Sequence, residues 1–387
     1  MNWRVPLFEP DFGEAELEAI KKPVINQWVT MGEITAQFEA EFARRCGVKH
    51  AIAVNNCTAA LHLAVEAAGI KPGDEVICPT LTFVATANAV RYVGATPVLC
   101  ESVGADNLNI GPAQVEARIT PKTRGILVVH YAGFPVDMVG MQALADKHGL
   151  VIIEDCAHAL FSVLQGRPCG TWGKVGAFSF FGNKNMTCGE GGMVTTNDDA
   201  VAARVRNMRS HGMTTLTYDR YKGRAVGYDV ISHGYNYRMD EIRSALALVQ
   251  LQRLDGFLAE RRRIRDRYCE RLDNSDITVP DFGWKRISAL GDSVGYHIMP
   301  VLVPEGIDRD AVAATLKENG IQSSMHYRPI HLFSAFSVAE NSGNRPQLTE
   351  KLAERQMTLP MYPTMTNDQI DLVCECLLRA LRVNQRG

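Results

Sequence analysis

Between about residues 50 and 200, short apolar segments rich in β-branched residues alternate with segments whose apolar residues recur at helical spacing. The strand-like segments are EVICP (75–79), TPVLC (96–100), GILVVHY (125–131), LVIIED (150–155) and GAFSFF (176–181). The helical patterns between several of them are TAALHLAVEAAG (58–69), TFVATANAVRYVG (82–94), PAQVEARI (112–119) and DMVGMQALADKHG (137–149). This alternation predicts an α/β fold with a mainly parallel sheet covered by helices on both faces. In such sheets ligands bind at the carboxyl ends of the strands.

The pattern changes after about residue 239, where a long helical stretch rich in arginine begins, MDEIRSALALVQLQRLDGFLAERRRIRDRYCERL. A smaller set of mixed segments follows it: GYHIMPVLV, DAVAATLKENG, SSMHY and DQIDLVCECLLRALR. We therefore expect a large domain over residues 1–250 and a small α+β domain over residues 251–387. The long helix is expected to connect them.

Composition narrows the class of protein without changing this picture. The chain has 387 residues, of which 46% are hydrophobic, and 41 basic against 43 acidic residues leave a net charge of −2. That balance predicts no broad surface for nucleic acid. The first 20 residues lack the basic and apolar regions of a signal peptide, and no apolar run reaches the ~18 residues of a membrane span. Ten cysteines occur without a CxxC motif, which favours reduced thiols. We expect a cytoplasmic protein with no membrane contact.

Three segments carry candidate chemistry. Lys184 lies in FSFFGNKNMTCGEGGM (178–193), between a short aromatic strand and a run of glycines, whereas most lysines are solvated surface residues. Asp155 ends a strand that reads as buried on both faces, where a carboxylate needs a cation or hydrogen-bond donors. Its alternative role is a helix cap or a salt bridge. Thr58 opens a helix, where unpaired N–H groups and the helix dipole favour a phosphate, although a plain N-cap is the alternative.

Competing ligand motifs fit these segments poorly. Lys184 has Asn on both sides, so it is not the lysine of a GxxxxGK[ST] phosphate loop, and GEGGMVTT runs into a strand rather than a helix. The chain has no HExxH, and His326 and His331 are badly spaced for one metal on a helix, so we expect no metal. Pyridoxal phosphate (PLP) uses all three components: a lysine, a carboxylate for the pyridine nitrogen and a helix start for the phosphate.

Six ordered motifs resemble the DegT/DnrJ/StrS family of PLP-dependent sugar aminotransferases, which have fold type I as in aspartate aminotransferase. They are WVTMG (28–32), FEAEFARRCGVKHAIAVNNCTAALHLA (38–64), PGDEVICPTLTFVATANAVRYVGATPV (72–98), IIEDCAHA (152–159), the lysine motif and GYNYRMDEIRSA (234–245). The resemblance covers nearly the whole chain. It implies a large domain with a mixed, mainly parallel seven-stranded sheet between helices, and a smaller α+β C-terminal domain.

The resemblance also implies roles for residues that match the family's motifs. Lys184 resembles the lysine that forms the Schiff base with PLP, and Asp155 resembles the partner of the pyridinium nitrogen. The remaining cofactor contacts implied are the phosphate-binding Thr58, Ala59 and Ser179, the ring-stacking Phe83, and His158 near the phenolic oxygen. One departure is Cys57, where the family commonly has Gly before the phosphate-binding Thr, because Gly allows φ values that Cys seldom adopts.

Two further segments are assigned by the same resemblance. Asn236 in GYNYRM resembles an asparagine that reaches the phosphate of the neighbouring subunit, which implies a homodimer with shared active sites. The segment HYRPIHL (326–332) resembles one beside the sugar and pyrophosphate, with His326, Tyr327, Arg328 and His331 as substrate contacts. A solvated loop with one structural histidine is the alternative for this segment.

The implied reaction moves an amino group from glutamate to the ketone of a nucleotide-linked deoxysugar, or in some branches of a cyclitol. FFGNK resembles the perosamine synthase branch, which acts on a GDP-linked 4-keto sugar, whereas HYAGFPVDM (130–138) and NMTCGEGG (185–192) look closer to aminotransferases of UDP sugars. A PLP-dependent 3-dehydratase would have histidine in place of Lys184. A non-catalytic PLP-binding regulator is the third alternative.

Overall fold

The computed structural model describes residues 3–215, 217–223, 225–336 and 345–384. Its centre is a seven-stranded sheet with the strand order β1-β9-β8-β5-β4-β2-β3. The strands are β1 (His50–Val54), β2 (Glu75–Pro79), β3 (Thr96–Cys100), β4 (Thr123–Val129), β5 (Val151–Asp155), β8 (Val175–Ser179) and β9 (Gly192–Thr196). β9 runs antiparallel to both of its neighbours, and the other pairs are parallel. The predicted mainly parallel, seven-stranded sheet of fold type I is confirmed.

Helices cover both faces of the sheet, which explains why its strands read as continuous apolar runs. On one face pack α3 (Cys57–Ala67), α4 (Ala85–Tyr92) and α7 (Asp199–Arg209). On the other face pack α5 (Pro112–Glu116) and α6 (Met138–His148) at one end, with α2 (Glu33–Cys46) and the first half of α9 at the other. Neighbouring residues divide between the faces: Leu127 belongs to the first core and Ile126 to the second.

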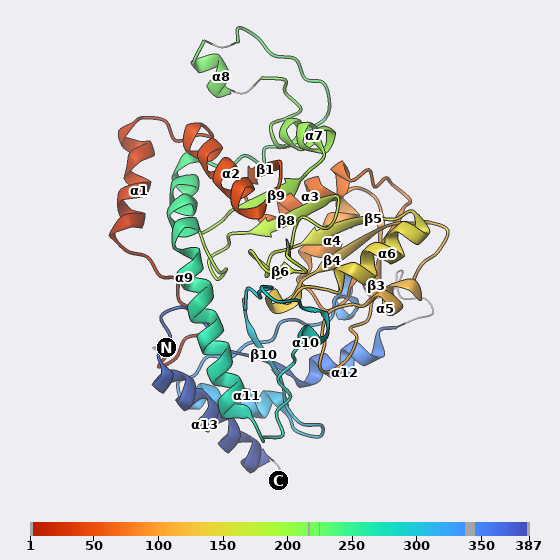
Figure 1. The fold of residues 1–387 in the computed structure, drawn as a ribbon, viewed down its shortest axis with the longest axis vertical. Coiled ribbons are helices and arrows are strands. Elements are labelled where there is room, and N and C mark those ends of the chain that lie inside the picture. Colours follow the sequence, from red (N-terminus) through yellow and green to blue (C-terminus); the bar gives the residue numbers. More distant parts are fainter. Residues whose placement is uncertain (1–2, 216, 224, 337–344, 385–387) are drawn as a thin grey trace.

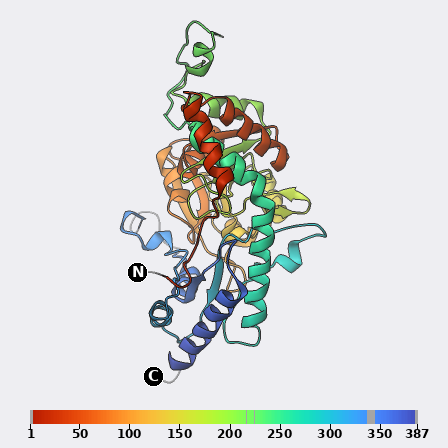
Figure 2. The ribbon, with the colours of Figure 1, turned by 90° about the vertical axis from the view of Figure 1, so that its left-hand side faces the viewer.

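The long arginine-rich pattern forms one helix, α9 (Glu241–Leu272), which runs along both parts of the molecule (Figures 1 and 2). Its first half packs on the sheet through Leu251 and Leu254, and its second half enters a C-terminal core through Ile264 and Tyr268. That core is built on β10 (Met299–Leu302), β11 (Gln356–Leu359), α11 (Arg309–Glu318) and α13 (Asn367–Asn384). Val5 also belongs to it. The boundary expected at residue 250 falls inside the continuous helix α9.

The remaining elements are short or peripheral. They are α1 (Glu14–Ile25), α8 (Thr217–Tyr221), α10 (Trp284–Ile287), α12 (Gln347–Arg355), β6 (Val163–Leu164), β7 (Arg167–Pro168), and the 3₁₀ turns η1 (Tyr131–Gly133), η2 (Ile330–Leu332) and η3 (Ser334–Phe336). Among the described residues, no helix combines the length and the apolar character needed to cross a membrane.

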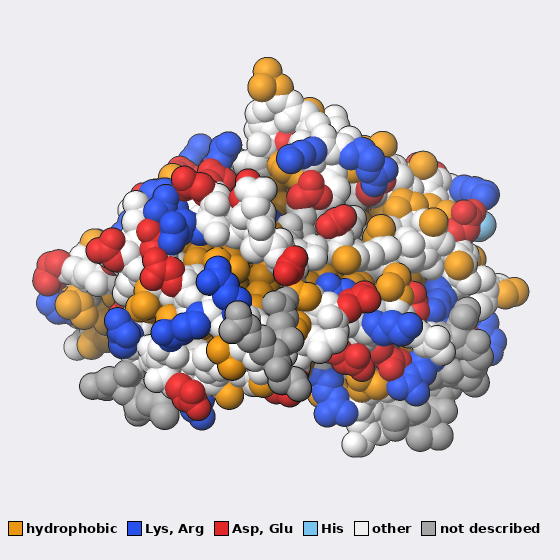
Figure 3. Space-filling view, turned by 90° about the horizontal axis from the view of Figure 1, so that it is seen from below, with side chains coloured by type: hydrophobic (Ala, Val, Ile, Leu, Met, Phe, Trp, Pro, Cys, Tyr) orange, Lys and Arg blue, Asp and Glu red, His pale blue; other side chains and the backbone are white. Residues whose placement is uncertain are grey.

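Between α7 and α9 the chain leaves the body as an arm that carries α8 (Figure 1). Large apolar side chains on this arm are exposed, namely Tyr221, Val226, Tyr228, Val230 and Ile231. Exposed apolar side chains gathered in one segment are typical of a protein–protein contact. Elsewhere the surface is mixed: on the face shown in Figure 3, acidic and basic side chains are interspersed.

Candidate active site

The carboxyl ends of β4, β5 and β8 open into a cavity of about 730 Å³, within the range of small-molecule sites. The predicted site residues that line it are Thr58, Ala59, Phe83, Asp155, His158, Ser179, Lys184, His326 and Tyr327. These residues come from the sheet, from the starts of α3 and α4, and from a C-terminal loop. The cavity therefore joins segments that are far apart in the sequence.

Lys184 follows β8 in a turn where its backbone N–H donates to the carbonyl of Phe181 at 2.9 Å. Its amine lies in the wall of the cavity, with Nζ 3.3 Å from His297 Nε2. Burial lowers the pKa of Lys184 to about 8, although Cys57 and Asp155 act in the opposite direction. A lysine with this pKa is neutral in a substantial fraction of molecules near pH 8, so that it can act as a nucleophile and exchange protons.

Asp155 is the last residue of β5 and is 4% exposed. Its Oδ2 accepts from the Thr86 hydroxyl at 2.9 Å and its Oδ1 from the Ala157 N–H at 3.1 Å. Burial raises the pKa of Asp155, against these hydrogen bonds and the charge of Lys184. In the described parts of the chain no ion pair reaches this carboxylate. A buried carboxylate of this kind fits a ligand that brings a cationic N–H group.

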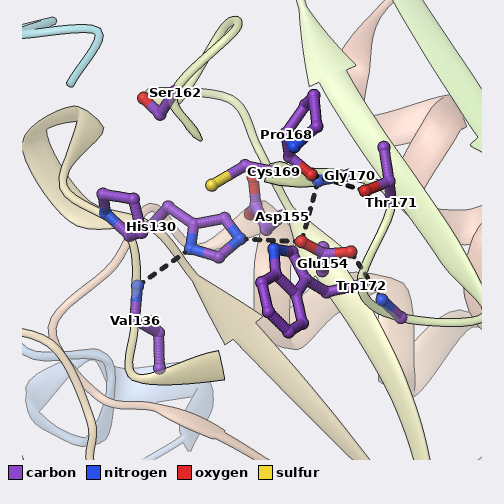
Figure 4. Close-up of polar contacts among 12 residues, drawn as sticks. His130, Val136, Glu154, Asp155, Ser162, Pro168, Cys169, Gly170, Thr171 and Trp172 are labelled. Carbon is purple, nitrogen blue, oxygen red and sulfur yellow. Dashed lines mark hydrogen bonds and ion pairs between the residues drawn. The ribbon is translucent and has the colours of Figure 1, made fainter. Parts of the chain in front are cut away.

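The preceding residue, Glu154, points to the opposite side of the strand and anchors the backbone there (Figure 4). Its carboxylate accepts from the N–H groups of Gly170 at 2.7 Å and Gly173 at 2.6 Å, and it lies 3.0 Å from His130 Nε2. The N–H of Val136 donates to His130 Nδ1 at 3.1 Å, so the proton of this ring is on Nε2 and is donated to Glu154. His130, Glu154 and Cys156 could also be grouped around a cation. Hydrogen bonds to protein groups already satisfy the carboxylate.

The turn η1, which follows His130, holds two histidines near Lys184: His158 lines the cavity, and His297 contacts the lysine amine. The N–H of Ala132 donates to His158 Nδ1 at 3.3 Å, and its carbonyl accepts from the N–H of His297 at 2.9 Å. Ala132 has φ +58°, a left-handed conformation that is uncommon for alanine. The hydrogen-bonded pair of His130 and Glu154 therefore holds a strained turn, and this turn orients the rings of His158 and His297.

His158 and Tyr327 form one hydrogen-bonded unit over the cavity, with His158 Nε2 2.9 Å from the Tyr327 hydroxyl. Because Ala132 donates to Nδ1, the proton of this ring is on Nε2. Burial lowers the pKa of His158 well below its usual value, with Lys184 and His326 adding to the effect. The ring is therefore neutral at physiological pH and acts as a hydrogen-bond donor.

Phe83 is 57% exposed, although it is a large apolar ring, and it lies at the cavity with its ring centre 6.1 Å from that of Tyr327. A ring left uncovered in this way offers an apolar face to a planar ligand.

The start of α3 presents backbone donors to the cavity. Its N-cap Asn56 accepts from the Ala59 N–H at 2.8 Å, so this donor is already occupied. The N–H groups of Cys57 and Thr58 make no hydrogen bond with another described residue. Cys57 is the first residue of the helix and does not have a positive φ. The backbone therefore does not require at Cys57 the positive φ that glycine would allow.

Close packing places Ser179 beside this helix start. Ser179 ends β8 and pairs with Gly192 of β9. A Cβ on Gly192 would lie 2.6 Å from the backbone of Asn56, so only glycine allows β9 to approach α3 this closely. Unbonded N–H groups at a helix start, together with a hydroxyl, suit an anionic phosphate. With Lys184, Asp155 and Phe83, the residues present fit pyridoxal phosphate.

Three predicted residues do not line this cavity. Asn236 is exposed and bridges to Ser210 in the backbone. Arg328 is also exposed, and its Nη2 donates to the carbonyl of Leu332 at 3.0 Å. His331 is buried, with Nδ1 2.6 Å from the Thr80 hydroxyl and Nε2 2.7 Å from Glu350, so both of its nitrogens are engaged by protein groups.

The structure also adds residues to the site that the sequence did not single out. Tyr92, Asn183, Glu190 and Tyr237 line the cavity. His297 contacts Lys184. In the sequence, the only feature that could have indicated this role is that His297 is a lone histidine within GYHIMPVLV, just before the apolar residues of β10. A single polar residue in an apolar segment is more often a satisfied structural group, so this signal was weak.

Comparisons with known proteins agree with this geometry. The family model of the DegT/DnrJ/EryC1/StrS aminotransferases matches residues 10–378. The aminotransferase TlmJ from Streptoalloteichus hindustanus has a similar structure, with 32% identity, a TM-score of 0.89, and coverage of 98% of this chain and 99% of that one. PseC from Helicobacter pylori, an aminotransferase involved in the biosynthesis of pseudoaminic acid, has 27% identity, a TM-score of 0.89, and coverage of 99% of this chain and 100% of that one. Spr1654 from Streptococcus pneumoniae is described as a sugar aminotransferase. Its PMP-form has 27% identity, a TM-score of 0.90, and coverage of 98% of this chain and 100% of that one.

Proposed function

This chain belongs to the DegT/DnrJ/EryC1/StrS aminotransferase family and is a sugar aminotransferase, and on that basis we propose that it uses PLP to move an amino group from glutamate to the keto carbon of a nucleotide-linked deoxysugar. The observation that carries the proposal is the pairing of Lys184 with the buried Asp155 across one cavity. Its first substrate would be glutamate and its second a GDP- or UDP-linked 4-keto sugar. A cyclitol ketone is the alternative second substrate.

PLP, when bound, supplies an electron sink for negative charge that develops at a substrate carbon. Lys184 is the residue that would hold it covalently, and its amine would afterwards carry a proton to and from the substrate. The carboxylate of Asp155 would keep a ring nitrogen protonated, which is an electrostatic contribution made in a site shielded from water. The N–H groups of Cys57 and Thr58 and the hydroxyl of Ser179 would hold the phosphate. Phe83 would cover one face of the ring, and His158 would lie near its phenolic oxygen.

Two features favour amino transfer over other chemistry on this fold. Lys184 occupies the position where a 3-dehydratase has histidine, so that an amine is available for proton transfer. The lowered pKa of Lys184, about 8, suits a group that must both accept and release a proton near neutral pH. Ping-pong kinetics follow, because the amino group is stored on the enzyme between two half-reactions.

The proposal is tested by screening nucleotide-linked keto-sugars for glutamate-dependent amination. Formation of 2-oxoglutarate reports the first half-reaction, and mass spectrometry with NMR identifies the aminated sugar. If the protein aminates a free cyclitol ketone and no nucleotide sugar, the proposed substrate class is wrong. If the product has lost oxygen and gained no nitrogen, the reaction is a dehydration and not an amino transfer.

We place this reaction in the cytoplasm. All ten cysteines are free thiols, which suits a reducing compartment.

A homodimer with shared active sites forms part of the proposal. Lys184 is the only lysine or arginine among the described residues that line the cavity, whereas a nucleotide sugar and PLP together bring several phosphate charges. The exposed apolar side chains of the arm provide a surface for a second copy. Asn236 follows this arm and lies outside the cavity of its own chain, which suits a residue that acts on the partner's cofactor.

Asn236 is expected to act in trans. An Asn236→Ala variant should be strongly impaired, and refolding it together with inactive Lys184→Ala protein should restore activity, because one site of each mixed dimer then carries both residues. Steady-state amination by the mixture is compared with that of each parent treated alone in the same way. A mixture no more active than its better parent would show that each site is built from a single chain.

Arg328→Ala is expected to raise the KM for the keto-sugar by roughly 10- to 150-fold, the loss of one charge-assisted contact worth about 1.5–3 kcal/mol. The guanidinium is exposed, donates only to the carbonyl of Leu332 among the hydrogen bonds of the described residues, and lies in the loop that carries His326 and Tyr327 into the cavity. The glutamate half-reaction is the internal control, since glutamate has no pyrophosphate. Arg328→Lys, which keeps the charge, should retain most of the affinity. Equal losses in both half-reactions would assign Arg328 to folding instead.

A further inference from the structure

His297 is placed against the amine of Lys184 by a part of the chain 113 residues away. It is 3% exposed, its Nε2 lies 3.3 Å from Lys184 Nζ, and its ring centre is 4.3 Å from that of His158. Its backbone is fixed on both sides: the N–H donates to the carbonyl of Ala132 at 2.9 Å, and the carbonyl accepts from Nη1 of the buried Arg261 at 3.0 Å. The position of this ring is therefore set by groups outside the cavity.

Hydrogen bonds around Asn185 determine which nitrogen of His297 carries the proton. The Nδ2 amide of Asn185 donates to the carbonyl of Gly295 at 2.5 Å, so its Oδ1 faces His297 Nδ1 at 3.2 Å. An amide oxygen can only accept, and Nδ1 must then carry the hydrogen. The other nitrogen, Nε2, is left as an acceptor pointing at Lys184. Asn185 directly follows Lys184, so the lysine motif itself supplies the group that sets the tautomer.

We propose that His297 is a positioning residue for Lys184, whose Nε2 accepts a hydrogen bond from the amine and holds it at the cavity wall. This inference rests on the proposed role of Lys184 as the residue that binds the cofactor and moves protons.

The electrostatics of the cluster agree with an accepting imidazole. Burial, together with the charges of Lys184 and Arg261 and the rings of His158 and His326, lowers the pKa of His297 well below its usual value, so the ring is neutral. The other groups that face Lys184 are Asp155 and Cys57. A neutral acceptor favours the ammonium form of a lysine, which opposes the effect of burial. Removing the acceptor should therefore lower the pKa of Lys184 further.

The test measures the protonation of Lys184 directly in the full-length chain freed of cofactor. Competitive labelling with acetic anhydride between pH 6 and pH 10, followed by mass spectrometry of the Lys184 peptide, gives the pH midpoint, and the exposed Lys174 serves as the internal reference. The wild-type midpoint should lie near 8. His297→Phe keeps a ring of similar size without the acceptor and should lower the midpoint by about 0.5–1 unit, the size of one hydrogen bond. His297→Gln places an oxygen near the position of Nε2 and should keep the midpoint close to that of the wild type.

Asn185→Leu tests the tautomer with the histidine still present. Without Oδ1 to accept from Nδ1, the ring is free to carry its proton on Nε2 and no longer accepts from Lys184, so the midpoint should shift in the same direction as in His297→Phe. Circular dichroism and rebinding of PLP establish that each variant is folded. Unchanged midpoints in both folded variants overturn the inference, and so does an equal shift in His297→Gln and His297→Phe. Failure of the wild type to aminate any keto-sugar would instead refute the proposed function, whatever the midpoint of Lys184.

Discussion

Lys184→Ala is expected to reduce amino transfer by at least about 10⁴-fold, or about 5.5 kcal/mol of transition-state stabilisation. The substitution removes the only lysine or arginine side chain among the described residues of the cavity lining, and with it both the covalent link and the group that moves the proton. The measurement is the rate of the glutamate half-reaction in a single turnover. Lys174→Ala is the matched control, because Lys174 is an exposed lysine just before β8 and its change should leave the rate unaltered. Activity of Lys184→Ala within tenfold of the wild type would contradict the assignment.

A chemical experiment checks the same residue without a substitution. The purified chain with its cofactor should be yellow, and borohydride reduction followed by peptide mapping should place the pyridoxyl group on Lys184. The lowered pKa, about 8, distinguishes this amine from that of a surface lysine as the site of attachment. A label on any other lysine would refute the assignment.

Asp155→Asn is expected to slow the glutamate half-reaction by about three powers of ten or more, which corresponds to about 4 kcal/mol. The change keeps the size of the side chain and one oxygen that accepts from the Ala157 N–H, but it removes the charge and the second oxygen, which accepts from Thr86. PLP should still bind through the contacts at the start of α3. Its affinity, measured by titration of the apoprotein, should therefore fall far less than the rate.

Thr86→Val provides the comparison for this prediction. It removes one hydrogen bond from the same carboxylate while leaving the charge in place, and it should cost far less than Asp155→Asn. Normal glutamate turnover in Asp155→Asn would exclude Asp155 as the group that keeps the ring nitrogen protonated. Equal losses in the two variants would point to the placement of the carboxylate and not to its charge.

The two largest predicted effects concern residues that the sequence identified, and the reason is geometric. Asp155 and Ser179 end parallel strands, and the carboxyl ends of parallel strands meet at one edge of the sheet. Lys184 follows Ser179 after a short turn, and Thr58 lies in the first turn of a helix beside the same edge. The alternation of strands and helices therefore predicted that these residues lie at one edge of the sheet, because a parallel sheet places the ends of its strands there.

The structure separated residues that the sequence treated as a group. Within HYRPIHL, His326 and Tyr327 line the cavity, Arg328 is exposed, and His331 is engaged by Thr80 and Glu350. No periodicity predicts this division, because it depends on contacts with Thr80, which follows β2, and with Glu350 of α12.

By itself the sequence determined the strand and helix alternation, the mainly parallel sheet and the location of Lys184 and Asp155 at one edge of it. These features follow from apolar spacing and from the direction of parallel strands, which are properties of short segments. Only the tertiary structure decided which residues of α9 pack into each of the two cores, that Val5 joins the C-terminal core, and that His297 faces Lys184. Each of these depends on contacts between residues far apart in the chain, and such contacts leave no periodic signal because packing selects them by shape and hydrogen bonding after the local elements have formed.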